Sequence, residues 1–223
     1  MARRPFNDPE PLPDLNMMGR TAVSTVLTRF KAEQAGWHLV AVDATCGNGH
    51  DTCFLAQQLA ACADDPAYSV LSFDIQQAAL DSARVSAKKL PEAQRDRLFF
   101  LRQSHDQLLT ALHQHKAELL ASGVKSKLAV IMYNLGFLPR SDKRITTLKN
   151  TTLASLDQAA AALDPDGLLC VHAYGGHPGG LEELEAVEAW CSELPFAEWV
   201  VMRYAACNKA RNPEVLFLAW KRP

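Results

Sequence analysis

The sequence predicts an α/β fold, with helices on both faces of a mostly parallel sheet of seven strands. Short apolar runs alternate with helical segments along the 223 residues, which is typical of parallel strands joined by crossover helices. The first run, Leu39 to Val42, is continuously apolar, as expected for a strand buried on both faces. A turn containing Gly47 and Gly49 joins it directly to a helix, an arrangement that favours ligand binding.

The chain opens with an irregular segment and a long helix. Residues 1–15 contain four prolines and few apolar side chains, so we expect an irregular N-terminal arm. A helix is predicted over 16–34, ended by Gly36, and we expect it to cover either the sheet or the ligand pocket. Its apolar positions have helical spacing: Met18, Ala22, Val26 and Phe30. No linker or repeat divides residues 16–223, which we interpret as a single domain.

The stretch from Asp43 to Asp51 reads Asp-Ala-Thr-Cys-Gly-Asn-Gly-His-Asp and connects the first strand to a helix predicted over 52–63. Its glycines allow the backbone to approach a ligand closely. The free N–H groups at the start of the helix point toward the same place. A βα turn without a ligand is the simpler alternative.

The second strand is predicted over 69–74 and ends in Asp74, where an acid can accept hydrogen bonds from ribose hydroxyls. An amphipathic helix over 76–90 follows and ends at Pro91. A third strand over 98–101 leads to Ser104, His105 and Asp106, and a helix then continues to Leu120. This segment either contacts the bound ligand or, through Asp106, only caps the helix.

The fourth strand, predicted over 127–133, is followed directly by Asn134-Leu135-Gly136-Phe137. In open α/β sheets, ligands bind at the carboxyl ends of strands where the strand order reverses. We expect the first and fourth strands to be neighbours there, which would place Asn134 beside the Gly47 turn. A basic loop follows, and it indicates either phosphate contacts or a solvated surface: Arg140, Lys143, Arg144 and Lys149.

The remaining elements are predicted from apolar spacing and turn residues. They are a helix over 152–163, a turn over 164–167, a strand over 168–173, a Gly-rich turn over 174–180, an acidic helix over 181–194 and strands over 199–204 and 215–220. We expect the last two strands to be antiparallel to a neighbour or joined as a hairpin.

Composition narrows the class of protein. The net charge of −2 does not indicate general nucleic-acid binding, although a local basic patch suffices for it. No apolar run reaches ~18 residues and the N-terminus lacks a secretory signal, so we expect a cytoplasmic protein without a membrane span. The six cysteines form no C-x-x-C pair, which indicates reduced thiols and no metal site. Cys46 is either a small side chain tolerated at the turn or a catalytic thiol.

These motifs carry a family resemblance. The pattern Asp-Ala-Thr-x-Gly-Asn-Gly, with Asp74-Ile75 after the second strand, resembles the class I S-adenosylmethionine-dependent methyltransferases, whose fold is Rossmann-like. The chain is also similar to the narrower YtqB/MnmM type, whose older label is rRNA methylase. This similarity rests on the motifs at 43–52, 133–139, 142–147, 175–180 and 208–213. The chain departs from that type at Pro139-Arg140-Ser141 and at Tyr174-Gly175-Gly176-His177.

The resemblance implies S-adenosyl-L-methionine as cofactor and assigns the site. The cofactor-binding positions are Asp43, Thr45, Gly47, Asn48, Gly49, Asp51, Thr52, Asp74, Ile75, Gln76, Ser104, His105 and Asn134. The expected substrate-binding positions are Leu135, Gly136, Phe137, Arg140, Lys143, Arg144 and Lys149. The expected catalytic positions are Asn134, Tyr174 and His177. Asn134 and the Leu135 carbonyl can accept both N–H groups of an amine, so that its lone pair points at the methyl group. Phe137 can stack on a flat base.

The implied reaction is N-methylation of the 5-aminomethyl group of (2-thio)uridine at the tRNA wobble position, with the tRNA anticodon stem-loop as partner. Alternatives are a methyltransferase acting on rRNA, a small amine or a protein, and a non-catalytic cofactor-binding protein. The sequence leaves a homodimer open.

Overall fold

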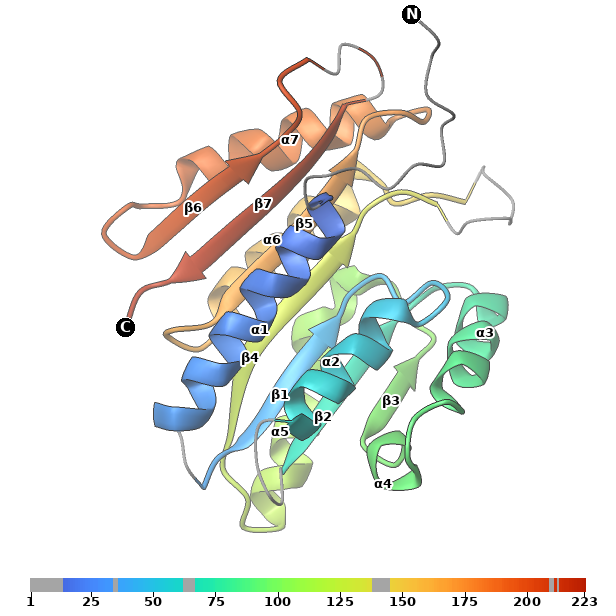
Figure 1. Cartoon of the computed structure of the whole chain (residues 1–223), viewed down its shortest axis with the longest axis vertical. Helices are drawn as coiled ribbons and strands as arrows, with labels where there is room; N and C mark the ends of the chain where they lie inside the picture. Colours follow the sequence, from blue (N-terminus) through green and yellow to red (C-terminus); the bar gives the residue numbers. More distant parts are fainter. Residues whose placement is uncertain (1–13, 34–35, 62–66, 138–144, 209–210, 212) are drawn as a thin grey trace, which may run out of the picture.

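The computed structural model describes residues 14–33, 36–61, 67–137, 145–208, 211 and 213–223. Within these residues the strands are β1 (His38–Asp43), β2 (Tyr68–Phe73), β3 (Leu98–Leu101), β4 (Ser126–Asn134), β5 (Leu168–Tyr174), β6 (Trp199–Tyr204) and β7 (Glu214–Lys221). They form one sheet in the order β3-β2-β1-β4-β5-β7-β6 (Figure 1). Among the described strands, β7 runs antiparallel to β5 and β6, and the other neighbouring pairs are parallel. The predicted mostly parallel sheet is therefore confirmed.

The helices follow the predicted pattern with small shifts. They are α1 (Leu15–Glu33), α2 (His50–Ala61), α3 (Gln77–Ala87), α4 (Glu92–Arg95), the 3-10 turn η1 (His105–Gln107), α5 (Leu108–Ala121), α6 (Lys149–Ala162) and α7 (Gly180–Glu193). Helix α2 begins at His50 rather than Thr52, so Asp51 lies in its first turn. Helix α6 begins at Lys149 rather than Thr152, and the short α4 was not predicted. Within the described residues, no helix is long and apolar enough to cross a membrane.

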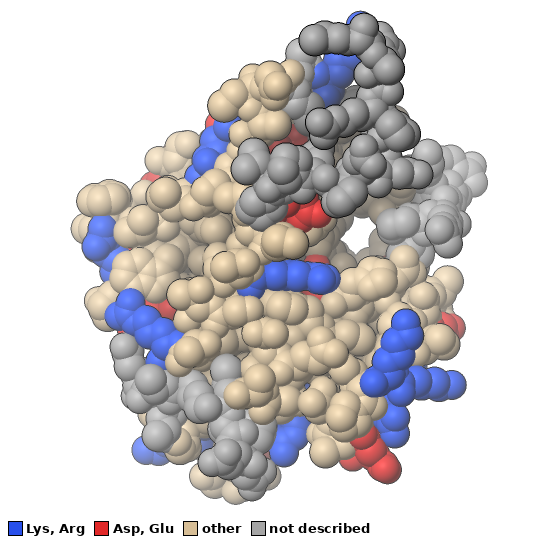
Figure 2. Space-filling model, in the orientation of Figure 1, with Lys and Arg blue, Asp and Glu red and all other residues tan. Residues whose placement is uncertain are grey.

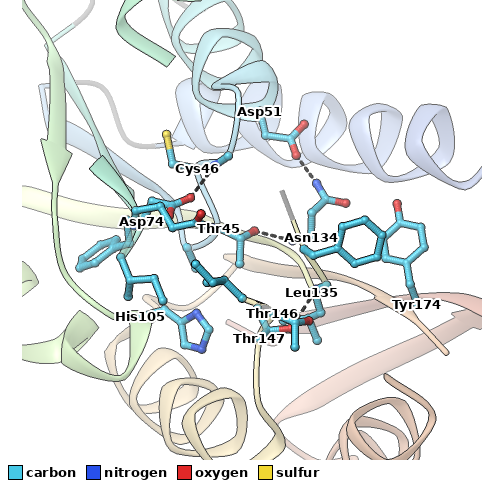
Figure 3. A pocket seen from close by; sticks show the side chains of 18 of the residues that line it. Thr45, Cys46, Asp51, Asp74, His105, Asn134, Leu135, Thr146, Thr147 and Tyr174 are labelled. Carbon is cyan, nitrogen blue, oxygen red and sulfur yellow. Dashed lines mark hydrogen bonds between the residues drawn. The ribbon is translucent and has the colours of Figure 1, made fainter. Parts of the chain in front are cut away.

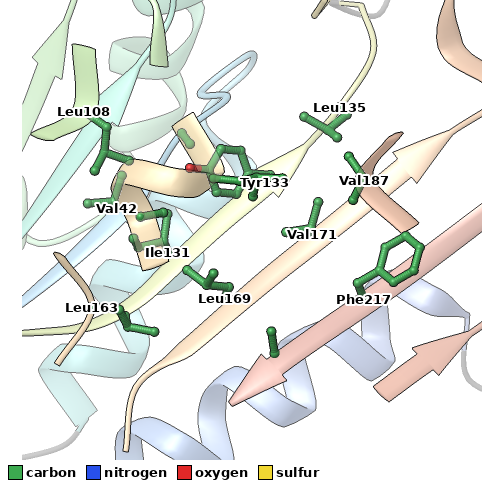
Figure 4. Packing of buried hydrophobic residues seen from close by; sticks show 14 of the residues in the cluster. Val42, Leu108, Ile131, Tyr133, Leu135, Leu163, Leu169, Val171, Val187 and Phe217 are labelled. Atoms are coloured by element: carbon green, nitrogen blue, oxygen red, sulfur yellow. The ribbon is translucent and has the colours of Figure 1, made fainter. Parts of the chain in front are cut away.

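Helices cover both faces of the sheet. On one face, α1 and α2 bury residues such as Leu27 and Leu55 against the strands. On the other face, α5, α6 and α7 bury residues such as Leu112, Leu156 and Val187 in a second apolar cluster (Figure 4). Burying apolar side chains on both faces explains why the strands read as continuous apolar runs.

The strand order reverses between β1 and β4, as predicted. From that point, β2 and β3 extend the sheet to one side, and β5, β7 and β6 extend it to the other. The turns that follow β1 and β4 therefore diverge and leave room between them for a ligand. Helix α1 packs on β4, β5 and β7 and brings Asn16 and Arg20 to this end of the sheet.

Candidate active site

The turn after β1 depends on two glycines with positive φ. Gly47 has a φ of 50°, and its N–H donates to Asp74 Oδ2 at 3.0 Å. Gly49 has a φ of 77°, and a Cβ there would lie 2.8 Å from the Ala83 Cα of α3. Neither conformation suits a residue with a side chain, and Gly49 also has no room for one. The turn therefore brings bare backbone to the start of α2.

Asp43 supports this turn from below. Its side chain is fully buried and accepts the Thr52 hydroxyl at 2.6 Å and the Thr45 N–H at 3.2 Å. Burial and the nearby Asp51 charge raise the pKa of Asp43 to about 7. Asp43 thus fixes the turn, because it ties Thr45 in the turn and Thr52 in α2 to the end of β1.

Asp74 lies where the prediction placed it, directly after β2. Its two carboxylate oxygens accept the N–H groups of Gly47 and Gln76, at 3.0 and 2.8 Å. Burial raises the pKa of Asp74, while these hydrogen bonds act in the opposite direction. The carboxylate is therefore held in one orientation at the cavity wall, and its remaining lone pairs can accept ribose hydroxyls.

A cavity of about 1120 Å³ opens at the carboxyl ends of β1, β2, β4 and β5 (Figure 3). Its size slightly exceeds the usual range for small-molecule sites, which is enough for a nucleoside-sized cofactor and part of an acceptor. Fifteen predicted site residues line it: Thr45, Gly47, Asn48, Asp51, Asp74, Ile75, Gln76, Ser104, His105, Asn134, Leu135, Gly136, Phe137, Tyr174 and His177.

Other predicted residues lie elsewhere. Asp43, Gly49 and Thr52 do not line the cavity; they lie behind the turn and hold its shape. Lys149 also lies off the cavity wall and forms an ion pair with Glu182 of α7. Arg140, Lys143 and Arg144 lie outside the described residues.

Asn134 ends β4 and is fixed at two points. Its backbone N–H donates to the Thr45 hydroxyl at 2.7 Å, and its side-chain Nδ2 donates to Asp51 Oδ2. Asp51 also receives Arg20 Nη2 from α1 at 3.0 Å. Because the amide nitrogen is bound by Asp51, the Asn134 Oδ1 points to the other side, toward Tyr174 (Figure 3). The site therefore presents an oriented hydrogen-bond acceptor beside the Gly47 turn.

The end of β5 and the start of β7 bring a hydroxyl, an imidazole and a carboxylate into contact. Tyr174 Oη lies 3.0 Å from His172 Nδ1, and His172 Nε2 lies 3.0 Å from Glu214 Oε1 of β7. His172 is almost fully buried, and Asn16 of α1 contacts its Nδ1 at 3.1 Å. Burial lowers the pKa of His172 and raises the pKa of Tyr174, so both groups are neutral near pH 7.

The segment after β4 folds back on itself. Phe137 pairs with Thr146 in an isolated antiparallel bridge, and the Gly136 N–H donates to the Thr147 hydroxyl at 2.8 Å. Thr147 in turn donates to the buried Glu183 of α7 at 2.7 Å. This chain of hydrogen bonds fixes the cavity wall formed by Gly136 and Phe137.

His177 faces that wall. Its ring meets Phe137 edge-on, with centroids 5.8 Å apart. Its Nδ1 lies 3.1 Å from the Pro178 carbonyl oxygen and 3.5 Å from the Thr146 hydroxyl. These contacts hold His177 at the cavity wall, beside Phe137 and Thr146.

Two buried groups limit the possible chemistry. Cys46 is 3% exposed, and burial raises the pKa of its thiol, so a nucleophilic thiolate is disfavoured. This geometry favours the simpler interpretation of Cys46 as a small side chain at the turn. His105 lines the opposite end of the cavity, where burial lowers the pKa of its ring and keeps it neutral.

Several cavity residues were not predicted. They come from α1, from the segment before α6 and from β7, and they include Asn16, Arg20, Thr146, Thr147 and Glu214. Each is polar and lies in or beside an element that apolar spacing alone predicts, so that spacing does not single it out. No spacing in the sequence brings them together, because their contacts join segments far apart in the chain.

Comparison with known proteins identifies the family. The family model described as "Putative rRNA methylase" matches residues 70–219. An Arabidopsis thaliana protein, "tRNA (mnm(5)s(2)U34)-methyltransferase, chloroplastic", is 33% identical over 177 residues, which are 79% of this chain and 61% of that protein. The chain thus spans less than two thirds of the length of this relative.

Solved structures show the same fold. An rRNA methylase structure from Clostridium thermocellum, named as putative, has a TM-score of 0.75 and 25% identity, covering 95% of this chain and 100% of the other. Protein SMU.1697c of Streptococcus mutans is named as a putative methyltransferase and was solved with SAH. It has a TM-score of 0.70 and 24% identity, and the match covers 94% of this chain and 99% of that one. These matches confirm the predicted Rossmann-like class I methyltransferase fold. Because the family model covers most of its length, the chain belongs to the rRNA methylase family.

Proposed function

We propose that this chain is an S-adenosylmethionine-dependent N-methyltransferase that converts the 5-aminomethyl group of (2-thio)uridine at the tRNA wobble position to 5-methylaminomethyl. The 33% identity to a tRNA (mnm(5)s(2)U34)-methyltransferase supports this substrate. The oriented Oδ1 of Asn134 in the cavity is the structural observation that carries the proposal. We further propose that residues 16–223 act as one methyltransferase domain.

The cavity residues fit the cofactor. The Gly47 turn, with its positive φ, brings backbone without a side chain to the cavity, and Asp74 offers carboxylate lone pairs beside it. Ile75 and Gln76 extend that wall, and Ser104 and His105 also line the cavity, where they would contact the adenine. When bound, S-adenosylmethionine supplies an electrophilic methyl group on a positively charged sulfur. The Gly47 turn would hold the methionine part, and Asp74 would hold the ribose.

Asn134 suits an amine acceptor. A neutral amine attacks with its nitrogen lone pair, and its two N–H bonds gain positive charge as the new bond to carbon forms. Asn134 Oδ1 and the Leu135 carbonyl can accept these two N–H groups, which leaves the lone pair free to point at the methyl carbon. The bound cofactor would supply the methyl carbon for the new nitrogen–carbon bond and would keep the electron pair of its sulfur–methyl bond, while Asn134 and Leu135 hold the amine in line.

Phe137 and His177 are the proposed contacts to the uridine. Phe137 lines the cavity next to Asn134, and the edge of the His177 ring supports it. A base extruded from the anticodon loop can stack on such a ring. We propose that the basic positions Arg140, Lys143, Arg144 and Lys149 contact tRNA phosphates around it.

The test uses purified protein, S-adenosylmethionine and tRNA isolated from cells that leave the aminomethyl group unmethylated. Nucleosides from the treated tRNA are then separated and weighed by mass spectrometry. We expect the 5-aminomethyl-2-thiouridine peak to be replaced by one heavier by a single methyl group. Unchanged tRNA, in a preparation that binds the cofactor, would remove this substrate.

The family description favours rRNA as a second candidate substrate. The same assay with ribosomal RNA, small amines and protein extract separates the alternatives, and binding without turnover on every substrate indicates a non-catalytic role. The predicted cytoplasmic location stays a prediction, since the similar Arabidopsis protein is chloroplastic. A homodimer also stays a prediction.

A further inference from the structure

We propose that Tyr174, His172 and Glu214 form a proton relay that deprotonates the acceptor amine. The inference rests on the proposed function, because it assumes that the acceptor enters as an ammonium ion. An aminomethyl group resembles the lysine amine, whose pKa is about 10, so most of it is protonated near neutral pH. A protonated amine has no lone pair for attack. Removing one proton is therefore a necessary step before methyl transfer.

The three side chains lie in a row that begins at the cavity. His172 and Tyr174 are two residues apart on β5 and so project from the same face of the strand. Glu214 is the β7 residue paired with Tyr174. Tyr174 and Glu214 line the cavity, whereas His172 is buried between them. The hydroxyl of Tyr174 lies on the same side as the Asn134 amide (Figure 3), within the region where Asn134 would hold the amine.

The contacts of the two ring nitrogens suggest the direction of transfer. His172 Nε2 lies 3.0 Å from Glu214 Oε1, which is an ion-pair distance without hydrogen-bond geometry, and Nδ1 lies 3.0 Å from the Tyr174 hydroxyl. In the relay the imidazole carries its proton on Nε2, beside the carboxylate, and Nδ1 accepts the Tyr174 hydroxyl proton. The lone pairs of Tyr174 Oη then remain for the ammonium. A hydroxyl, an imidazole and a carboxylate in this order are the arrangement by which a carboxylate fixes the tautomer of a histidine base.

Each step conserves atoms and charge. One proton moves from the ammonium nitrogen to Tyr174 Oη as the Tyr174 hydroxyl proton moves to His172 Nδ1. The tyrosine is again neutral, the amine is neutral, and the imidazolium lies beside the Glu214 carboxylate. The Nε2 proton then passes to Glu214, whose side chain is 28% exposed and can release it to water.

Charged groups on each neighbouring element favour the imidazolium. His172 faces Glu214 of β7, Asp51 of α2 and Asp14 ahead of α1, and all three carboxylates oppose the effect of burial on its pKa. Arg20 pairs with Asp51 and weakens that contribution. Asn16 Oδ1, an acceptor, lies 3.1 Å from Nδ1 and favours a proton on that nitrogen, so it competes with the Tyr174 hydroxyl for Nδ1.

Other groups in the cavity are less suited to this role. Asp51 already accepts hydrogen bonds from Arg20 and Asn134, so both of its carboxylate oxygens are engaged within the protein. His177 contacts Phe137, Thr146 and the Pro178 carbonyl oxygen, where it is placed to contact the uridine. His172 is the neutral imidazole whose Nδ1 lies next to a cavity hydroxyl and whose Nε2 lies next to a carboxylate.

The test is the pH dependence of single-turnover methylation by Tyr174→Phe, which keeps the ring packed on His172 with centroids 4.3 Å apart. General-base assistance contributes roughly 10²- to 10⁴-fold in rate. We expect a loss of that order near pH 7 that shrinks toward pH ~10, where the amine deprotonates in solution. Glu214→Gln should show the same pattern with a smaller loss. Tyr204→Phe, on β6 and away from the cavity, is the matched control and should match the wild type.

The outcomes are distinct. A Tyr174→Phe loss that is equal at every pH would leave the hydroxyl as a positioning group and overturn the relay, and an unchanged rate would overturn it as well. Either result leaves wild-type methylation of the amine, and thus the proposed function, intact. Nitrogen NMR of the free protein adds a readout without turnover. We expect His172 to be neutral at pH 7 with its proton on Nε2, and a proton on Nδ1 would overturn the relay.

Discussion

At the scale of single residues, the cavity wall consists of polar groups that are oriented before a ligand binds. Asp74 is held by two backbone N–H groups and Asn134 by Thr45 and Asp51. Such preorganisation lowers the cost of ordering side chains when the cofactor and acceptor bind. The same property makes single substitutions informative, because few neighbouring side chains can take over the contact that a substitution removes.

Asp74→Ala should weaken S-adenosylmethionine binding by ~1–3 kcal/mol, because the variant cannot form a charge-assisted hydrogen bond to the ribose. Titration calorimetry measures this directly. Asp81→Ala, on the exposed side of α3, is the control and should bind normally. Unchanged affinity in a folded Asp74→Ala protein would place the ribose elsewhere.

Asp43 should make the stability of the wild type fall as pH rises. Its pKa is about 7 in the folded protein and about 4 when unfolded, so between these values the folded state holds more protons. Ionisation therefore lowers the free energy of unfolding, by at most about 1.4 kcal/mol per pH unit. The Asp43→Asn variant has no carboxyl group to ionise at this position, so its free energy of unfolding does not fall for this reason.

Urea unfolding at a series of pH values tests this difference. The stabilities of wild type and Asp43→Asn should diverge from pH ~4 to pH ~7, with the variant gaining relative to the wild type. Asp81→Asn, at an exposed carboxylate, should follow the wild type. Parallel curves for Asp43→Asn through this window would show that Asp43 ionises normally.

At the scale of elements, the cofactor turn requires close packing between α2 and α3. Gly49→Ala should destabilise the fold twice, by ~1–2 kcal/mol for its positive φ and by ~1–3 kcal/mol for the clash of a Cβ with Ala83. Gly123→Ala is the matched control, with a φ of 76° and open space around it. It should show the φ contribution alone. If Gly49→Ala and Gly123→Ala lose equal stability in urea unfolding, α2 and α3 can move apart without a cost in free energy.

Element positions could be predicted because apolar spacing dictates which faces are buried. Helix α6 was predicted to begin late because Lys149, Asn150 and Thr151 carry no apolar signal, although the backbone is already helical there. The short α4 was missed because four residues show no period. The Gly47 turn and Asp74 could be predicted because adjacent strands bring their ends together in any such sheet.

The rest of the site depends on contacts between distant segments. Arg20 and Asp51 are 31 positions apart, and Asn134 and Asp51 are 83 positions apart. His172 has the pattern of a core residue in an apolar strand, and Glu214 lies on a strand whose neighbour was not decided by the sequence. The β7 strand had to be placed beside β5 before the interactions of Tyr174, His172 and Glu214 could be found.

At the scale of the whole molecule, tRNA binding needs basic side chains on a protein with a net charge of −2. Arg140, Lys143 and Arg144 belong to the loop that follows the cavity residue Phe137 in the sequence, while Lys149 already pairs with Glu182. Lys and Arg side chains also gather on the side of α3 and α4 (Figure 2), where Arg84, Lys88 and Arg95 line a shallow hollow. The loop and the hollow each contribute three basic side chains, so replacing one set or the other removes the same charge.

Replacing Arg140, Lys143 and Arg144 together with Ala should weaken tRNA binding. The slope of log affinity against log salt should also fall by ~1 for each phosphate that the variant no longer binds. The triple Ala variant at Arg84, Lys88 and Arg95 removes the same charge from around α3 and α4 and should keep the wild-type slope. Filter binding over a salt series measures both. Equal slopes for the two variants would make the loop an ordinary solvated surface.

The most direct test of the proposed chemistry is single-turnover methylation of aminomethyl tRNA by Asn134→Ala, with S-adenosylmethionine affinity measured in parallel. Asp51 keeps its ion pair with Arg20 in this variant, so the cofactor wall should stay intact. We expect the rate to fall by ~10²–10³ with nearly unchanged cofactor affinity, because the variant lacks an acceptor that acts in the transition state. A wild-type rate, or a parallel loss of cofactor affinity and rate, would contradict the role of Asn134 in directing the amine.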